Sequence, residues 1–308
     1  MTLVVVVKCV DGLVLAADSR VTEHRFDDEV PGSHRKVIND TGRKLHSFRA
    51  PFEHVGVLSF DYGAISAGFK GEETEIAAQT KRYSVETCIR KFKEPLYNSL
   101  KRRITVQEFR DLLFTFLIEY WQRYRDRRLS SSNATNKSAL LPELEVKLLV
   151  AGFNEGEKEG HVFPIWLTDN NEFWIGGRYR GFSPCSERNE LIRSPCGIFC
   201  DGAKDFVELV LAAEDPAKSL EKLQGGSTNA TVAEIAAIRS RLDIRYVSEP
   251  RFFNFFSSAD IVTQDAQRLA DLLIKGTIAF YGEEGPVGGA RRICTINPLT
   301  GTKCRKRS

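Results

Sequence analysis

The sequence contains no apolar run that approaches the roughly 20 residues of a membrane-spanning helix. Its apolar opening, "TLVVVVK" (2–8), is too short for the core of a signal peptide and follows no charged segment. The seven cysteines, an odd number at scattered positions, fit reduced thiols better than a disulfide framework. These absences predict a cytoplasmic protein with no membrane partner.

Sequence motifs for nucleotides, catalytic zinc and serine nucleophiles are missing as well. The chain has no P-loop, no dinucleotide-binding glycine pattern, no His-Glu-x-x-His and no Gly-x-Ser-x-Gly. Its histidines lie at no metal-ligand spacing, and no second pair completes a zinc site with Cys196 and Cys200. We therefore expect no cofactor, no metal and no nucleophile activated by histidine.

The charge of the chain does not indicate a nucleic-acid partner. The net charge is +3 over 308 residues, with 44 Lys and Arg against 41 Asp and Glu. Dense basic stretches are short, one at the end of a predicted helix (120–128) and one at the end of the chain (303–308). We expect the terminal stretch to be a solvated, disordered tail, and we expect no nucleic-acid binding.

The sequence does contain two batches of strand patterns, each followed by helical patterns. Predicted strands lie at 2–8, 13–17, 43–48, 54–60, 145–153, 161–168, 171–177, 194–202 and 290–296. Predicted helices lie at 73–100, 106–127, 203–213, 229–242 and 259–280. This order predicts an α+β fold with antiparallel sheets. Since each sheet must bury a face, the simplest arrangement is a four-layer α-β-β-α sandwich.

Several residues are predicted to begin or end these helices. Thr105 and Glu108 form a capping-box pattern at the start of the second helix. Pro95 is expected to end or kink the first helix. Ser258 or Asp260 is expected to cap the last helix.

Thr2 is a residue that can act as a nucleophile without a histidine. Methionine aminopeptidase removes Met1 readily when the second residue is small, and Thr2 would then carry both a hydroxyl and a free α-amine. An α-amine with a pKa near ~7.7–8.0 can accept the hydroxyl proton. This chemistry also needs a lysine that lowers both pKa values, a carboxylate that holds the lysine, and an oxyanion donor.

The predicted strands bring candidates for these roles together. A turn at Asp11-Gly12 would return the second strand alongside the first and place Asp18 near Thr2. Lys44 begins a following strand and is the preferred lysine. Lys36 is the competitor, but it lies in a polar stretch that we expect to be a long loop.

The oxyanion donor is most simply the backbone N–H of Gly63, in the turn after strand 54–60. The alternatives to these functional roles are ordinary structural ones. Thr2 could be a frayed strand end, and Asp18 and Arg20 could form a surface ion pair.

The segment "MTLVVVVKCVDGLVLAADSRVTE" (1–23) resembles the start of proteasome β-type subunits, which belong to the N-terminal nucleophile (Ntn) hydrolase superfamily. "RKLHSF" and "HVGVLSFDYGAISA" resemble the lysine strand of that family and the strand and turn that follow it. The spacing between them is most similar to the bacterial ancestral β-subunit (Anbu) group. "VKLLVAGF", "CDGAKDF" and "PVGGARRICTI" resemble later parts of the family in outline.

This resemblance implies an Ntn-hydrolase domain spanning 1–308, with insertions near 23–43, 129–143 and 216–257. It implies a threonine-type endopeptidase that acts on peptides or unfolded proteins, packed with copies of itself in a ring or open ring. Because the chain has no nucleotide motif, any ATPase unfoldase that feeds such an assembly would be a separate protein. The alternative is a catalytically silent β-type subunit that serves as a ring scaffold or binding module.

The resemblance also implies roles for individual residues. Thr2 matches the nucleophile, Lys44 the pKa modulator and Asp18 its partner, with Arg20 nearby. Further along, the chain departs from the family in the polar groups that orient the α-amine. Asp201 stands where the family usually has a serine, and it could bind the amine or simply favour the N-terminus of the next helix.

A second departure lies near residue 284. Glu284 keeps the late carboxylate of the family, whereas Val287 replaces a hydroxyl. The alternative for Glu284 is an ordinary turn carboxylate.

Overall fold

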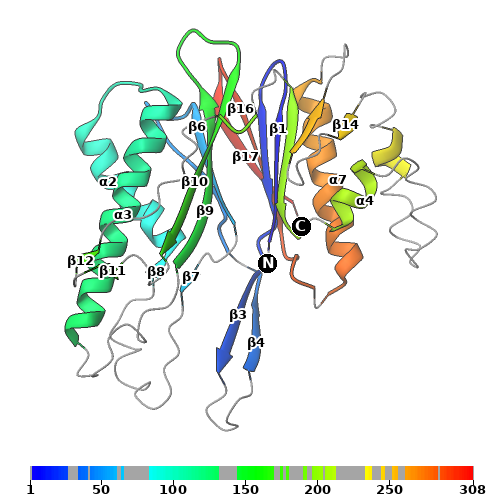
Figure 1. Ribbon diagram of the computed structural model, residues 1–308. Coiled ribbons are helices and arrows are strands. Elements are labelled where there is room, and N and C mark those ends of the chain that lie inside the picture. The colour runs from blue at the N-terminus through cyan, green and yellow to red at the C-terminus, as the bar shows by residue number, and fades with distance from the viewer. Residues whose placement is uncertain are drawn as a thin grey trace.

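The computed structural model describes most of the chain. The described residues are 2–26, 34–40, 42–60, 64–65, 83–131, 144–169, 174–175, 178–179, 190–192, 196–203, 205–212, 233–237, 244–246, 252–255, 261–283 and 285–307. Within these ranges the protein is α+β, with two main antiparallel sheets (Figure 1). None of the helices in the same ranges is both long and apolar enough to cross a bilayer.

The larger sheet contains the N-terminal strand at its centre. Its seven strands run in the order β14-β15-β13-β1-β2-β16-β17. Their bounds are Leu3–Lys8 (β1), Leu13–Ala17 (β2), Gly197–Gly202 (β13), Ile244–Tyr246 (β14), Phe252–Phe255 (β15), Arg291–Asn297 (β16) and Gly301–Arg307 (β17). The predicted pairing of the first two strands is confirmed, because β1 and β2 form an antiparallel hairpin.

The smaller sheet has four strands in the order β10-β9-β6-β5. Their bounds are Leu45–Ser47 (β5), Val55–Phe60 (β6), Leu144–Phe153 (β9) and Gly160–Asp169 (β10). Three further strand pairs lie outside the main sheets. They are β3–β4 (Val21–Phe26 and His34–Asn39), β7–β8 (Ala64–Ile65 and Tyr83–Ser84) and β11–β12 (Trp174–Ile175 and Arg178–Tyr179).

Helices cover the outer face of each main sheet. Figure 1 shows α2 (Val85–Ser99) and α3 (Val106–Ser131) beside the smaller sheet, and α4 (Asp205–Ala212) and α7 (Thr263–Tyr281) beside the larger one. Alternation along β1 explains the packing: Leu3, Val5 and Val7 face one apolar core with α4 and α7, whereas Val4 and Val6 face a second core between the sheets. A third core lies between the smaller sheet and α2 and α3.

The polar stretch predicted as a loop within 23–43 contains a hairpin instead. Strands β3 and β4 pair from Val21 opposite Asn39 to Phe26 opposite His34. The hairpin projects from the main sheets (Figure 1). The polarity of the stretch concealed it, although Thr22 pairs with Ile38 and supplies a β-branched pair of the kind strands favour.

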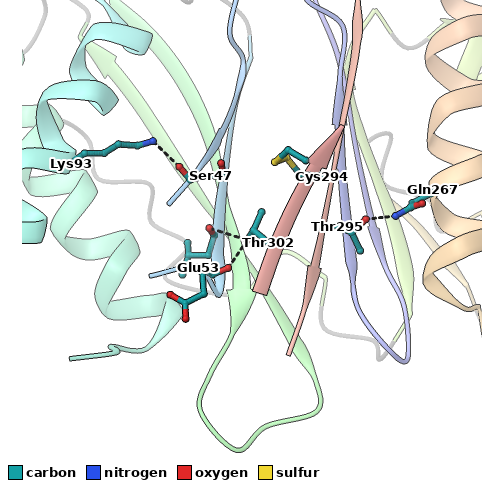
Figure 2. The surroundings of a disulfide bond; sticks show 9 residues. Ser47, Glu53, Lys93, Gln267, Cys294, Thr295 and Thr302 are labelled. Atoms are coloured by element: carbon teal, nitrogen blue, oxygen red, sulfur yellow. Dashed lines mark hydrogen bonds between the residues drawn. A yellow bond between two sulfur atoms is a disulfide. The ribbon is translucent and has the colours of Figure 1, made fainter. Parts of the chain in front are cut away.

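The basic end of the chain is a strand, so the prediction of a disordered tail is wrong for 303–307. β17 pairs with β16 along its whole length. The Asn297 side chain accepts hydrogen bonds from the backbone N–H groups of Leu299 (2.9 Å) and Thr300 (3.2 Å), which fixes the connecting turn. The Thr302 hydroxyl donates to the carbonyl oxygen of Glu53 at 2.6 Å, so the hairpin also contacts the other sheet (Figure 2).

A disulfide joins Cys294 of β16 to Cys304 of β17, which face each other across the hairpin (Figure 2). The prediction of reduced thiols is therefore wrong for this pair. The cause is strand pairing, which brings together two cysteines that look unrelated in the sequence. Cys9, Cys88 and Cys200 are free thiols, as expected, and all three are buried.

The predicted helix ends are confirmed in part. Thr105 and Glu108 form the capping box: the Glu108 carboxylate accepts from Thr105 N–H at 2.8 Å, and the Thr105 hydroxyl accepts from Glu108 N–H at 3.1 Å. Pro95 lies inside α2, which continues to Ser99. Ser258 and Asp260 lie outside the described residues, and α7 begins at Thr263, after both.

Candidate active site

The β1–β2 hairpin places Asp18 beside the start of β1. Val4 pairs with Ala17, the last residue of β2, so Asp18, which follows it, lies opposite Leu3. The Asp18 Oδ1 atom accepts a hydrogen bond from Leu3 N–H at 3.0 Å, and the Thr2 hydroxyl donates to the same oxygen at 3.3 Å. The turn and strand lengths thus bring a hydroxyl and a carboxylate together.

Lys44 joins this pair from the segment that leads into β5. Its ammonium donates to Thr2 Oγ1, to Asp18 Oδ1 at 2.9 Å and to the carbonyl oxygen of Arg20 at 2.5 Å. These contacts use all three ammonium N–H groups. The backbone at Lys44 is fixed in turn, because its carbonyl accepts from Ser59 N–H of β6 at 2.7 Å.

Asp18 is held by the backbone as well as by Lys44. Its Oδ2 accepts from Arg20 N–H at 3.1 Å and from Gly288 N–H at 3.2 Å. A Cβ at position 288 would overlap the Arg20 guanidinium, so a residue other than glycine there would displace that side chain. Together with Leu3 N–H, three backbone donors and one ammonium orient a carboxylate that is completely buried.

The whole group lies out of water. Thr2 is 2% exposed, Asp18 is 0% exposed and Lys44 is 8% exposed. Burial lowers the pKa of the Lys44 ammonium below its ordinary value, although Asp18 and Asp40 act in the opposite direction. A buried ammonium in contact with a hydroxyl oxygen can stabilise negative charge on that oxygen more strongly than it would in water.

Arg20 supports the site by joining segments of the chain around it. Its guanidinium donates to both carboxylate oxygens of Asp40, at 2.7 and 3.0 Å, and to the carbonyl oxygens of Glu283 and, at 3.2 Å, Gly285. The hydrogen bonds from Arg20 hold the pKa of the Asp40 carboxyl below its usual range. Arg20 therefore ties the end of β2 to the segment that carries Gly288.

Sequence reasoning missed Asp40, because no pattern links it to Arg20 twenty positions earlier. The only local signal is the turn sequence "NDTG" (39–42). Ser19 was also missed. Its hydroxyl donates to the Asp40 carbonyl oxygen at 2.5 Å and accepts from Ala290 N–H at 2.8 Å. Like Arg20, Ser19 therefore joins the end of β2 to Asp40 and to the segment that carries Gly288.

Asp201 lies at the end of β13, next to β1. It pairs with Val4, and the neighbouring Ala203 N–H donates to the Thr2 carbonyl oxygen at 2.7 Å. Gly202 has φ = +94°, and a Cβ at this position would overlap that same carbonyl oxygen. Asp201 is a strand residue rather than the N-terminal residue of a helix, because α4 begins at Asp205.

Three further residues were predicted, Lys36 as the competing lysine and Gly63 and Glu284 as supporting residues. Lys36 belongs to β4, in the separate β3–β4 hairpin, whereas Lys44 makes the contacts expected of the lysine. Gly63 and Glu284 lie outside the described residues. No cluster of three His, Cys, Asp or Glu side chains in the described part of the chain is arranged to hold a metal ion.

No protein-family model matches the chain, and no curated protein matches it. Among solved structures it is similar to an Anbu (Gly-1) mutant from Hyphomicrobium sp. strain MC1, with 13% identity and a TM-score of 0.45, covering 100% of this chain and 88% of that one. It is also similar to Anbu (ancestral beta-subunit) from Yersinia bercovieri, with 12% identity and a TM-score of 0.45, covering 98% of this chain and 86% of that one. Likeness at this level is not evidence for an activity or an assembly.

Proposed function

We propose that the chain is an N-terminal threonine hydrolase that cleaves peptide or amide bonds. The observation that carries this proposal is the contact of the buried Lys44 ammonium with both the Thr2 hydroxyl and the Asp18 carboxylate. A structural ion pair needs only the lysine and the carboxylate. A hydroxyl nucleophile also needs the contact between the lysine ammonium and its own oxygen, because the alkoxide that forms during attack must be stabilised.

The reaction begins with removal of Met1, which frees the α-amine of Thr2. This amine takes the hydroxyl proton, directly or through a water, as Thr2 Oγ1 attacks the substrate carbonyl carbon. When the tetrahedral intermediate collapses, the bond to the leaving amine breaks and that amine receives the proton. Water then attacks the threonine ester while the α-amine accepts its proton, and that proton passes to Thr2 Oγ1 as the ester C–O bond breaks and the acid leaves.

Lys44 and Asp18 have different electrostatic roles in this reaction. The Lys44 ammonium stabilises negative charge on Oγ1 during attack and lowers the proton affinity of both the hydroxyl and the amine. Asp18 keeps that ammonium in place, since its two oxygens are already fixed by three backbone N–H groups. In this proposal, Gly63 N–H is the donor to the oxyanion, and Glu284 supports the α-amine.

We further propose that the layers described above form the four-layer sandwich of the Ntn hydrolases, in one domain over 1–308. The three apolar cores, which lie on either side of each sheet, support this assignment. The proposal includes self-assembly into a ring or open ring in the cytoplasm, with peptides or unfolded proteins as substrates. A separate ATPase would supply any active unfolding.

One observation favours a second candidate, a silent subunit that serves as a scaffold. Thr2 is only 2% exposed, so a substrate carbonyl reaches Oγ1 only if removal of Met1 or a shift of the surrounding residues opens a path. The buried Lys44–Asp18 pair would then be a purely structural tie between β2 and the segment that precedes β5.

Two substitutions at one position separate the candidates. Thr2→Ser keeps a hydroxyl and a small second residue, whereas Thr2→Ala keeps only the small residue. We expect hydrolysis of a mixed peptide library, followed by mass spectrometry, to persist in Thr2→Ser and to stop in Thr2→Ala, while both variants keep the oligomeric state of the wild type. Equal hydrolysis by wild type and Thr2→Ala would refute the assignment of the nucleophile, and absence of hydrolysis in all three proteins would favour the scaffold.

A further inference from the structure

The Asp201 carboxylate is buried and has one oxygen without a partner. Asp201 is 7% exposed. Its Oδ1 accepts a hydrogen bond from Gly202 N–H at 2.7 Å, whereas its Oδ2 is buried and makes no hydrogen bond. Buried carboxylate oxygens in native proteins are nearly always hydrogen-bonded, because an unpaired one loses its hydration without compensation. In the part of the chain that the structure describes, Oδ2 therefore lacks the donor that a buried carboxylate oxygen needs.

The strand register places Asp201 near Thr2 and on the same face of the sheet. Asp201 pairs with Val4, and alternation along β1 puts Thr2 on the same face as Val4. Diagonal neighbours of this kind lie about 7–8 Å apart between Cα atoms, within reach of one side chain. The Ala203 bond to the Thr2 carbonyl at 2.7 Å holds the two strand ends together at this point.

The other charged groups around Thr2 already have partners. Lys44 is 2.9 Å from Asp18, and the Arg20 guanidinium is 2.7 Å from Asp40. Cys200, the neighbour of Asp201 on β13, adds no charge, since burial and the Asp201 carboxylate raise the pKa of its thiol.

The described residues of the neighbouring segment 285–290 (Gly-Pro-Val-Gly-Gly-Ala) add no charge either. Asp201 is thus the one carboxylate among these described neighbours that no cation offsets.

We propose that Asp201 is a positioning residue that holds the α-ammonium of processed Thr2 in an ion pair, and that this pair keeps the nucleophile at rest until the ammonium loses its proton. The inference rests on the proposed function, because it concerns the same amine after Met1 has been removed. An adjacent carboxylate favours the charged form of an amine. Catalysis would then begin at a higher pH than it would without the Asp201 carboxylate.

The first experiment measures the α-amine itself and does not depend on activity. Thr2→Ala retains a small second residue, so Met1 is still removed, and the protein has no nucleophile. Competitive labelling of the α-amine with acetic anhydride across neutral and alkaline pH gives its pKa. We expect this pKa to be lower in Thr2→Ala/Asp201→Asn than in Thr2→Ala by about 1 unit or more. Equal values would overturn the proposal.

A matched control removes another carboxylate nearby in sequence. Asp205 begins α4, and its carboxylate already has a hydrogen-bond partner, because it accepts from the Tyr281 hydroxyl at 2.6 Å. Asp205→Asn in the Thr2→Ala background should leave the pKa of the α-amine unchanged.

If Asp201→Asn does not fold, Asp201→Ser replaces it. If neither folds, Asp201→Ala in the Thr2→Ala background takes their place: a lower pKa of the α-amine than in Thr2→Ala supports the ion pair, and an equal pKa overturns it.

The ion pair and the proposed function can fail separately. If the pKa of the α-amine falls in Asp201→Asn but the wild type hydrolyses nothing, the hydrolase proposal is wrong and the ion pair is supported. If the wild type hydrolyses peptides through Thr2 and Asp201→Asn has the same pH profile, the ion pair is wrong and the hydrolase proposal is unaffected. With both correct, the activity of Asp201→Asn rises at a lower pH than that of the wild type.

Discussion

At the scale of single residues, the site depends on a buried ammonium and a buried carboxylate that differ in their other partners. Asp18 has three backbone N–H donors besides Lys44. The Lys44 ammonium donates to the Thr2 hydroxyl, to one carbonyl oxygen and to Asp18, which is the one anion among these three acceptors. Removing the carboxylate therefore leaves a buried charge without a counter-ion, whereas removing the lysine leaves a carboxylate that is still hydrogen-bonded.

This asymmetry predicts unequal losses of stability. Asp18→Asn should lower the free energy of unfolding by about 3–5 kcal/mol, the usual cost of an uncompensated buried charge. Lys44→Met should lower it by only about 1–3 kcal/mol. Urea unfolding of both variants measures the difference. A larger loss in Lys44→Met than in Asp18→Asn would contradict this description of the site.

The sequence predicted that Asp18 and Lys44 lie close to Thr2, because local signals were sufficient for that. The Asp11-Gly12 turn sets the register of β1 and β2, and that register alone brings Asp18 to Thr2. Lys44 was preferred over Lys36 because Lys36 lies in a polar stretch that was expected to be a loop. Asp40 was beyond prediction, since its contact with Arg20 depends on where the chain returns after the β3–β4 hairpin.

At the scale of elements, α7 begins with a cap that comes from a distant part of the chain. Its N-cap residue, Val262, has no side chain that can accept a hydrogen bond. Asp11, in the β1–β2 turn, accepts instead from Thr263 N–H at 2.8 Å and from the Thr263 hydroxyl at 2.7 Å. A carboxylate at a helix N-terminus also interacts favourably with the helix dipole.

We therefore expect Asp11→Ala to lower the free energy of unfolding by about 1 kcal/mol, a typical cost of losing an N-cap. Asp11→Asn should lose less, because its side-chain oxygen still accepts both hydrogen bonds and only the charge is removed. Thermal unfolding of the two variants tests this. If Asp11→Ala is as stable as the wild type, Asp11 does not cap α7.

Element types were more predictable than their ends and partners. Strands and helices with apolar patterns were found because burial imposes a period on the sequence. The cap of α7 was sought at Ser258 or Asp260, close in sequence, and Asp11 lies about 250 positions away. β17 was taken for a tail because its basic residues conceal a strand that is specified by the turn before it and by its pairing with β16.

At the scale of the whole molecule, a charged cluster ties the two sheets together at the end of β1 opposite Thr2. Lys8 is completely buried and donates to Glu159 at 2.9 Å, to Glu190 at 3.1 Å and to the carbonyl oxygen of Ile192 at 3.0 Å. His161 of β10 extends the cluster. Its hydrogen bonds to Glu190 and Glu157 outweigh burial and raise its pKa to about 8.

This shift predicts a pH dependence of stability. Protonated His161 stabilises the folded state fully below its ordinary pKa of 6.5, and the contribution is lost as the pH rises through about 8. As the pH rises from 6.5 to about 8, the free energy of unfolding of the wild type should fall by about 1 kcal/mol more than that of His161→Gln. This figure is smaller than the full shift in pKa would give, because His161 is partly exposed to solvent. Urea unfolding at several pH values checks this, and parallel curves for the two proteins would rule it out.

The central claim is that Thr2 acts through its own hydroxyl and its own α-amine. A peptidyl epoxyketone tests it most directly, because this electrophile closes a ring only with a hydroxyl and an amine on the same residue. Mass spectrometry of the N-terminal peptide after treatment should show a chain without Met1 and a single adduct on Thr2. A folded protein that keeps Met1, or one that has lost Met1 and leaves Thr2 unmodified, would contradict the claim.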